Sequence, residues 1–343
     1  MTCVALSVGG AAVAAESMSI PRTAEGKPDF SGLWTHETLT PLERPVQYGT
    51  RPIMTPEEVR AAEKYAADHV RRGDEPTDPK AGILDLPTDC GYGFTGTNCG
   101  YNSFWVDRGD SVLRINGEPR ASIIVDPSNG RLPPMLPEAG KRLAAERAAF
   151  RGGSGAADGP EVRSLGERCL LSFGSNGGPP MLPNMYNNAY QFVQTKDHVM
   201  FLVEMVHDAR VVRMNGKPLP DSVPKWLGDS IGRWEGDTLV VETTNFHPQP
   251  TYRGAGPSRK VTEKFSYASP NEILYRFTVS DPTTFSAPFS GELIFNKTDE
   301  QVYEYACHEG NYALPGILAG ARTEESARQK ASVREVDNED EGE

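Results

Sequence analysis

The fold is decided by residues 260–280, KVTEKFSYASPNEILYRFTVS. Apolar and polar side chains alternate on both sides of Ser269–Asn271, and the Ser-Pro-Asn sequence of that segment is typical of a turn. Alternation with a period of two, interrupted by a short turn, predicts two antiparallel strands that each bury one face. One face would hold Val261, Phe265 and Tyr267 from the first strand, and Ile273, Tyr275, Phe277 and Val279 from the second.

The same period of two runs through most of residues 189–308. Turn signals separate the apolar runs at intervals of about ten residues, a spacing typical of an antiparallel meander of about eight or nine strands. A meander of that length tends to close, because closure removes the exposed edges. We therefore predict a mainly β fold, an antiparallel up-and-down barrel that is filled by side chains or holds one small ligand. The other apolar runs are Val199–Met205, Phe289–Phe295 and Val302–Ala306, and the other turn signals are Lys196-Asp197, Asn215-Gly216, Glu235–Asp237 and Thr298-Asp299.

The first half of the chain predicts an irregular arm with two short helices. Thr55 can cap a helix in which Glu58 completes a capping box, and Gly73 can end it. A second helix fits residues 138–150, and the Gly-rich segment 151–160 is the best candidate for a linker. The expected organisation is a signal peptide at 1–15, an N-terminal arm packed on the barrel at 16–160, the antiparallel barrel at 161–325 and a disordered acidic tail at 326–343.

Composition and charge exclude several classes of protein. The formal net charge is −12, which disfavours a nucleic acid or an anionic membrane as a partner on electrostatic grounds. Six carboxylates lie in the last nine residues, so this segment reads as a solvated tail. No apolar run reaches the length of about 18 residues that a membrane-spanning helix needs.

The N-terminus predicts export. Val4–Ala15 is small and apolar and ends in an Ala-Val-Ala sequence before Glu16, as the apolar core and cleavage site of a signal peptide do. The basic residues that usually precede such a core are missing, and a disordered Ala-rich terminus is the alternative. We expect a periplasmic or secreted protein.

Cysteine usage agrees with an oxidising compartment. Once Cys3 leaves with the signal peptide, four cysteines remain, and an even number favours disulfides. A bridge between Cys90 and Cys99 would close a short Gly-rich loop and would leave Cys169 to pair with Cys307. Four cysteines allow three pairings, so this connectivity is the simplest choice among them. The cysteine spacings do not support a zinc site.

Seven strings of the sequence carry a resemblance: Pro28–Trp34, Val125–Pro134, Glu167–Leu170, Gly178–Asn188, Glu204–Val211, Trp226–Asn245 and Tyr303–Asn311. Together they resemble an uncharacterised family of exported bacterial proteins. The resemblance implies export and one continuous domain, and it carries no reaction, cofactor or catalytic residue. Separately, Gly32–Trp34 resembles the Gly-x-Trp element that opens the first strand of lipocalin-type barrels, so the predicted barrel is calycin/lipocalin-like.

Two His-carboxylate pairs are candidates for general acid–base chemistry. His207-Asp208 and His308-Glu309 both fall at the ends of predicted strands, where barrel mouths lie. Imidazole titrates near neutral pH and can transfer protons when a carboxylate orients it. Neighbours on a strand point to opposite faces, so a dyad across strands is favoured, either His207 with Glu309 or His308 with Asp208. The alternative is that each histidine caps a turn or satisfies buried backbone groups.

Arg210 and Glu204 share the parity of Asp208 on an extended strand. Arg210 can clamp a substrate anion or oxyanion, with a buried salt bridge as the alternative. A carboxylate in an apolar strand is costly unless it is paired, so Glu204 is either paired with an arginine or functional.

Amides and tyrosines are the candidates for binding. Tyr186, Asn187 and Asn188 precede the first strand of the meander and offer a phenol and two amides to a polar ligand. The alternative is turn chemistry. Tyr305 and Tyr312 lie close to His308 in sequence and would favour an aromatic guest if they lined a cavity, although aromatic residues in a barrel usually form its core.

Other chemistries have little support. No nucleophile elbow, phosphate-binding loop or dinucleotide fingerprint occurs in the sequence. We predict no cofactor and no metal, with a divalent metal held by His207 and His308 as a minor alternative.

The predicted function is that of an exported enzyme of the lyase, hydrolase or isomerase type. It would act by His-carboxylate general acid–base chemistry on a small, partly apolar molecule inside the barrel, with an aromatic molecule as one option. The alternatives are a periplasmic lipocalin-like protein that binds a hydrophobic molecule without catalysis, and a scaffold with a filled barrel. The only partner predicted is the small molecule, and no oligomeric state is assigned.

Overall fold

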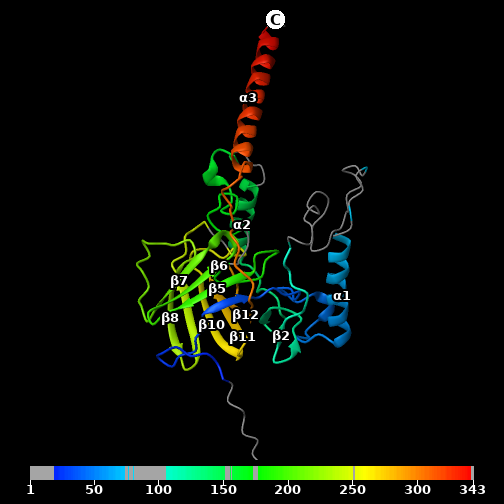
Figure 1. Ribbon diagram of the computed structural model, residues 1–343. Coiled ribbons are helices and arrows are strands. Elements are labelled where there is room, and N and C mark those ends of the chain that lie inside the picture. The colour runs from blue at the N-terminus through cyan, green and yellow to red at the C-terminus, as the bar shows by residue number, and fades with distance from the viewer. Residues whose placement is uncertain are drawn as a thin grey trace, which may run out of the picture.

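Nine strands form a closed barrel in the computed structural model of this chain (Figure 1). The structure describes residues 19–73, 76, 80, 106–150, 155, 157–172, 177–249 and 252–340. The strand order is β1-β5-β6-β7-β8-β9-β10-β11-β12, and pairing of β1 with β12 closes the ring. The strands are β1 (Gly32–Thr35), β5 (Ala189–Gln194), β6 (His198–Val203), β7 (Ala209–Met214), β8 (Asp229–Glu235), β9 (Thr238–Thr244), β10 (Lys260–Ser269), β11 (Glu272–Ser280) and β12 (Phe289–Lys297).

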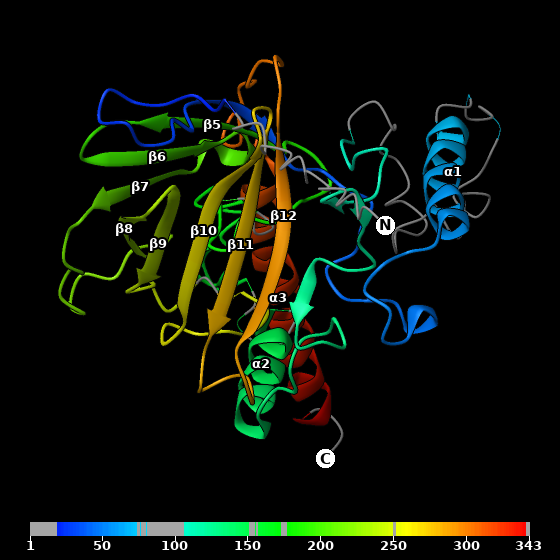
Figure 2. The same cartoon turned by 90° about the horizontal axis from the view of Figure 1, so that it is seen from below.

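The remaining elements belong mostly to the N-terminal arm. A short strand, β4, adds to the outer edge of β12, and β2 and β3 form a separate two-stranded sheet. Figures 1 and 2 show α1 at one side of the barrel, beyond β2 and β12. These elements are β2 (Arg114–Ile115), β3 (Glu118–Pro119), β4 (Ile124–Asp126), α1 (Pro56–Gly73), α2 (Pro137–Phe150) and α3 (Ala313–Asp340), with short 3-10 turns at Val46–Tyr48, Pro160–Val162 and Met205–His207.

The predicted mainly β barrel is confirmed, and two of its strands come where the alternation placed them. β10 and β11 pair in antiparallel register around the expected turn, with Phe265 opposite Tyr275. The predicted helices are also present, and Thr55 and Glu58 exchange the two capping-box hydrogen bonds at 2.7 and 3.2 Å. One strand of the barrel, β1, comes from the segment predicted as the N-terminal arm and pairs with β5.

One pairing departs from the predicted antiparallel meander. β7 and β8 are parallel, with Val212 opposite Ser230. Asn215-Gly216 does not start a hairpin, because the chain returns along residues 215–228 before it enters β8 from the same end as β7. Prolines at 218, 220 and 224 interrupt this connection, and a proline cannot donate to a sheet ladder.

Aromatic rings fill the barrel. Phe192 meets Phe201 edge-on at 4.6 Å between ring centroids, and Phe201 stacks on Phe265 at 5.1 Å. The Trp34 indole is buried at one end of this cluster and donates to the Phe30 carbonyl at 2.9 Å. Side chains therefore fill the barrel interior around Phe192, Phe201 and Phe265, as a barrel of this size allows.

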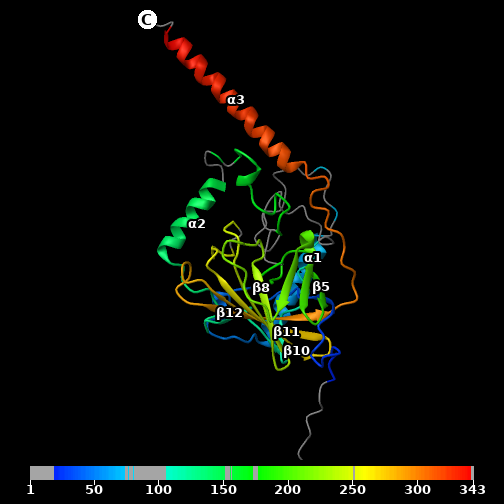
Figure 3. The same cartoon turned by 90° about the vertical axis from the view of Figure 1, so that its left-hand side faces the viewer.

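The C-terminal part of the chain differs from the prediction. Residues 326–340, expected to be disordered, belong to α3, which projects away from the barrel (Figures 1 and 3). Arg322 pairs with Glu325, and Glu324 pairs with Arg328, at the helical spacings of three and four residues. Alanine, glutamate, arginine and lysine also have high helix propensity, so the charged run suits a helix as well as a tail. None of the described helices combines the length and the apolar character needed to span a membrane.

Candidate functional site

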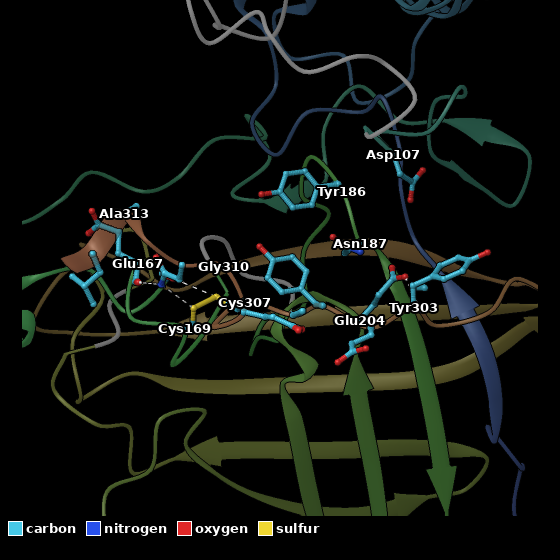
Figure 4. Close-up of a pocket in the computed structure, with 18 of the residues that line it drawn as sticks. Asp107, Glu167, Cys169, Tyr186, Asn187, Glu204, Tyr303, Cys307, Gly310 and Ala313 are labelled. Carbon is cyan, nitrogen blue, oxygen red and sulfur yellow. Dashed lines mark hydrogen bonds between the residues drawn. A yellow bond between two sulfur atoms is a disulfide. The ribbon is translucent and has the colours of Figure 1, made fainter. Parts of the chain in front are cut away.

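A cavity of about 1080 Å³ lies at one end of the barrel, where β1 ends, β5 begins and β6 ends (Figure 4). Thr35, Ala189 and Glu204 contribute to it from these three strand ends. The other walls come from segments outside the barrel strands and from the first turns of α3. We call this space the mouth cavity. Its lining includes Asp107, Glu167, Tyr186, Asn187, Glu300, Tyr303, Glu304, Tyr305, Glu309, Leu314 and Ile317.

Residues 298–312, which we call the wall segment, cross the mouth of the barrel between β12 and α3. The predicted strand at Val302–Ala306 does not form, and side chains satisfy the backbone of this segment instead. The Tyr303 N–H donates to Glu204 Oε1 at 3.1 Å, and the Tyr305 N–H donates to His207 Nε2 at 3.2 Å. Alternating apolar and polar residues form a strand only when a neighbouring strand satisfies their backbone hydrogen bonds. In the wall segment, the side chains of Glu204 and His207 accept these hydrogen bonds instead.

A disulfide fastens the end of the wall segment. Cys307 is bonded to Cys169, with 5.7 Å between their Cα atoms, which confirms this predicted pair. Nearby, the Asn311 amide donates to the Glu167 carbonyl at 3.1 Å. The other predicted pair, Cys90 with Cys99, lies outside the described residues, as does the predicted signal peptide.

The mouth cavity is strongly acidic. Its described lining contains six carboxylates and no lysine, arginine or histidine. One of them, Glu167, pairs with Arg163 at 2.6 Å. Within the described part of the chain, the other five have no ion-pair partner. These five are Asp107, Glu204, Glu300, Glu304 and Glu309.

Two carboxyl groups near the cavity hold protons more tightly than usual. Burial, with the negative charges of Asp107, Glu300 and Asp110, raises the pKa of Glu37 to about 7. Asp107 keeps an exposed face, yet partial burial and the charges of Glu300 and Glu204 raise its pKa as well. A raised pKa in a cluster of carboxyl groups is typical of sites that share a proton.

Glu37 is positioned by the end of β1. Thr35 donates a hydrogen bond from its hydroxyl to Glu37. His36, between them, is buried, stacks on Phe295 and contacts the Tyr190 hydroxyl at 3.0 Å. Burial lowers the pKa of His36 to about 3, so it stays neutral and anchors the strand end in the core.

The predicted binding residues divide into two groups. Tyr186, Asn187 and Tyr305 line the mouth cavity. Asn188 is buried and donates to the carbonyls of Asp107 and Asn184, at 2.6 and 2.9 Å, so it holds the backbone of Asp107. Tyr312 is 84% exposed and lies outside the cavity lining.

Arg210 points into the barrel and not into the mouth cavity. It forms two hydrogen bonds with Glu263, which is fully buried and also accepts from the Tyr275 hydroxyl at 2.8 Å. This is the buried salt bridge that was the alternative to an anion clamp. Glu263 was missed, although it shares the apolar face of Val261 and Phe265 in the sequence.

The expected row of Glu204, Asp208 and Arg210 is interrupted. Met205–His207 forms a 3-10 turn, and Val206 and His207 have positive φ angles of 60° and 51°. Glu204 is 6% exposed and faces the cavity, without an arginine partner among the described residues. Asp208 is also buried, accepts from the Ser172 N–H at 3.2 Å and has a pKa raised to about 6 by burial.

The two predicted dyads are not present as hydrogen bonds within the described residues. His207 is exposed and contacts the wall segment through Nε2. His308 is exposed and does not line the cavity, whereas Glu309 does. No group of three or more His, Cys, Asp and Glu side chains in the described ranges is arranged to hold a metal ion.

Sequence reasoning missed Glu37, Asp107 and Glu300. Glu37 follows the predicted first strand directly, and an ionisable residue at a strand end was a usable signal. Asp107 and Glu300 lie in irregular segments, where no periodicity relates one segment to another.

Comparisons of this chain with protein-family models, curated proteins and solved structures gave no match. The resemblance to exported bacterial proteins therefore stays a prediction. The chemistry of the site has to be inferred from its own geometry.

Proposed function

We propose that this protein is an exported enzyme that performs general acid–base chemistry on a small, partly apolar molecule held in the mouth cavity. The reaction would be of the lyase, hydrolase or isomerase type. One observation carries the proposal: the cavity contains Asp107, whose own pKa is raised and whose charge, together with burial, raises the pKa of Glu37 to about 7. The Cys169–Cys307 disulfide supports an oxidising compartment.

The two carboxyl groups suit the roles of acid and base. Neighbouring carboxyl groups that cannot both ionise keep one proton between them near neutral pH. In the proposed reaction, Asp107 on the cavity wall accepts or donates a proton at the substrate. Glu37, whose pKa the charge of Asp107 helps to raise, is the second proton store. General acid–base catalysis of this kind contributes about 10²–10⁴-fold to a rate.

The other cavity residues support a partly apolar substrate. Leu314 and Ile317 of α3 provide an apolar side, and Tyr186 and Tyr305 provide rings with polar tips. A volume of about 1080 Å³ is enough for a molecule of drug size. The filled barrel interior moves the proposed binding site from the lumen to the mouth.

A second candidate is a binding protein without catalysis. It is favoured by the position of His207 and His308, neither of which lines the mouth cavity. In that case Asp107 and Glu204 would only recognise the ligand. The difference between the two functions is turnover, and it is measurable.

Native mass spectrometry of the protein isolated from cells would first identify a retained molecule. That molecule and its analogues would then be assayed with the wild type, Asp107→Asn and Glu37→Gln. The matched control is Glu25→Gln, since Glu25 is exposed in a turn at residues 23–26. An enzyme loses at least tenfold in kcat with Asp107→Asn. Turnover that survives both Asp107→Asn and Glu37→Gln contradicts the proposed mechanism, and binding without any turnover favours the second candidate.

A further inference from the structure

We propose that His207 is a pH-dependent latch on the wall of the mouth cavity. Its neutral ring holds the wall segment through the Tyr305 amide, and its protonated ring releases that amide and donates to the Tyr303 carbonyl instead. The inference concerns access to the cavity, so its biological meaning rests on the proposed function. The latch itself is a property of the fold and can be tested without a substrate.

The wall segment depends on few contacts. It forms no strand, although it crosses the mouth of the barrel between β12 and α3. Glu204 accepts the Tyr303 N–H, and His207 accepts the Tyr305 N–H. Residues 303–307 all line the cavity, so the position of the cavity wall depends on these contacts.

One nitrogen of His207 contacts two backbone groups with opposite requirements. Nε2 lies 3.2 Å from the Tyr305 nitrogen, which donates to it, and 3.3 Å from the Tyr303 oxygen, which can only accept. A ring nitrogen accepts when it carries no proton and donates when it carries one. The two hydrogen bonds therefore exclude each other, and the protonation of Nε2 decides which one forms.

Uptake of a proton by the ring changes this choice. The bond with Tyr305 requires a neutral ring whose proton is on Nδ1, whereas the charged ring carries protons on both nitrogens. Histidine is the side chain that ordinarily changes charge between pH 5 and pH 8. His207 is exposed, so solvent can deliver the proton. We therefore expect the wall segment to be held at Tyr305 at the upper end of this range and released there at the lower end.

The backbone of the turn supports a role as a switch. Val206 and His207 have φ angles of 60° and 51°, in the left-handed region. This region is unfavourable for a β-branched residue such as Val206. Strained backbone of this kind persists only where the surrounding structure fixes it, and it is concentrated at active sites and switch regions. Here it presents the His207 ring to the wall segment.

Neighbouring ionisable groups act on other contacts. Asp208 is buried, accepts from the Ser172 N–H and has a pKa raised to about 6, so its titration bears on Ser172. Glu204 bears on the Tyr303 amide. Of the titratable groups near the ring, only His207 accepts the Tyr305 amide. In the described chain, the ionisable side chains of the two elements that meet at the ring are Glu204 and Asp208 on the turn, and Tyr303, Glu304 and Tyr305 on the wall segment.

Nuclear magnetic resonance of the isotope-labelled full chain between pH 5 and pH 8 tests the latch. At the upper end, Nε2 of His207 should give the signal of a ring nitrogen without a proton. As the pH falls, the Tyr305 amide proton should shift upfield with the same midpoint as the His207 ring. Its protection from hydrogen exchange, corrected for the intrinsic effect of pH, should fall about three- to tenfold, as the loss of one hydrogen bond predicts. The Tyr303 amide is the internal reference and should keep its protection.

Variants assign the transition to His207. His207→Asn suits the left-handed backbone, does not titrate and is too short to reach Tyr305, so the Tyr305 amide should be weakly protected at every pH. His198→Asn, at an exposed histidine that begins β6, is the matched control and should behave as the wild type. Asp208→Asn keeps an acceptor for Ser172 and should leave the Tyr305 transition in place.

The outcomes separate this inference from the proposed function. A proton on Nε2 of His207 at pH 8, or equal protection of Tyr305 at both ends of the range, overturns the latch and leaves the proposed enzyme unaffected. Joint loss of protection at Tyr303 and Tyr305 that disappears in Asp208→Asn also overturns it. A working latch in a protein whose Asp107→Asn variant keeps full turnover supports the latch and contradicts the proposed acid–base mechanism.

Discussion

The backbone N–H of Tyr303 donates to Glu204 Oε1 across 99 residues of sequence, at 3.1 Å. One oxygen of a buried carboxylate thus positions the wall segment, and the other is left for the cavity. Strands β6 and β12 are not neighbours in the barrel, so this contact joins two sides of the mouth. The structure of the cavity and its charge therefore depend on the same side chain.

Removal of the disulfide should loosen the cavity before it unfolds the barrel. Cys169→Ser with Cys307→Ser removes a link between residues 138 positions apart, which should cost about 2–5 kcal/mol in the free energy of unfolding. Urea denaturation measures this loss. Hydrogen exchange should show the Tyr303 and Tyr305 amides exchanging at least tenfold faster. Unchanged exchange at these amides would mean that Glu204 and His207 hold the wall segment without the disulfide.

Glu37→Gln should change how stability depends on pH. The pKa of Glu37 rises from 4.5 to about 7 on folding, so the native state binds more protons between these values. The free energy of unfolding of the wild type therefore falls as pH rises through this window. Glutamine keeps the acceptor for Thr35 and has no proton to lose. Relative to the wild type, the variant should gain about 1–2 kcal/mol between pH 5 and pH 8, allowing for solvent screening.

Urea titrations at several pH values test this difference. Asp208, whose pKa is raised to about 6, titrates in both proteins and cancels in the comparison. Glu25→Gln is the control and should follow the wild type at each pH. A constant difference between the Glu37 variant and the wild type would show that Glu37 is not protonated near neutral pH.

The buried pair of Arg210 and Glu263 should behave as a structural unit. Arg210→Met leaves the Glu263 charge in the core with Tyr275 as a partner, and should cost about 3–5 kcal/mol. Glu263→Gln should also destabilise, because it leaves the guanidinium without its counter-ion. The double variant should lose clearly less free energy of unfolding than the two single variants lose together. Urea denaturation of the wild type, both single variants and the double variant would show this. Additive losses would mean that the two side chains do not interact.

His308→Ala separates the sequence-based mechanism from the structural one. His308 is exposed outside the cavity lining, so its removal should change the free energy of unfolding by less than about 0.5 kcal/mol. Turnover of the identified substrate should also persist, since Asp107 and Glu37 remain. Loss of turnover in a folded His308→Ala variant would restore this histidine as the catalytic base.

Gly291→Ala should disturb the barrel without any change at the mouth. A methyl group at this position of β12 would overlap the Phe277 ring on the neighbouring strand. Overpacking of this kind costs about 1–3 kcal/mol, which thermal or urea unfolding would detect. Phe277→Leu in the same chain should recover part of the loss. A Gly291→Ala protein as stable as the wild type would mean that the ring moves freely.

The strands with clean alternation could be predicted because each buries one face in the barrel. Val261 and Phe265 on β10, and Ile273 and Tyr275 on β11, behave in this way. The parallel pairing of β7 with β8 could not be predicted, because apolar and polar residues alternate in the same way in parallel and in antiparallel strands. The wall segment was wrongly predicted to be a strand. Its residues alternate as those of a strand do, but its backbone N–H groups donate to the side chains of Glu204 and His207 and not to a neighbouring strand.

The candidate site could be predicted only in part. Glu204 was identified from its parity on a predicted strand, Tyr186 from the segment before the first strand of the meander and Tyr305 from its nearness to His308 in the sequence, and all three line the cavity. Asp107 and Glu300 come from irregular segments whose positions are set by long-range contacts, such as that of Asn188 with the Asp107 carbonyl. Arg210 was predicted as an anion clamp, because the burial of its actual partner, Glu263, depends on the closed barrel.

The β1–β12 seam has a consequence for synthesis of the chain. Trp34 and Thr35 pair with Lys297 and Asn296, so the first barrel strand meets the last one. The ring cannot close until residues 289–297 have joined the sheet, although β5 to β10 are complete by residue 269. Until then the nascent sheet has an open edge, which is a template for pairing with other chains.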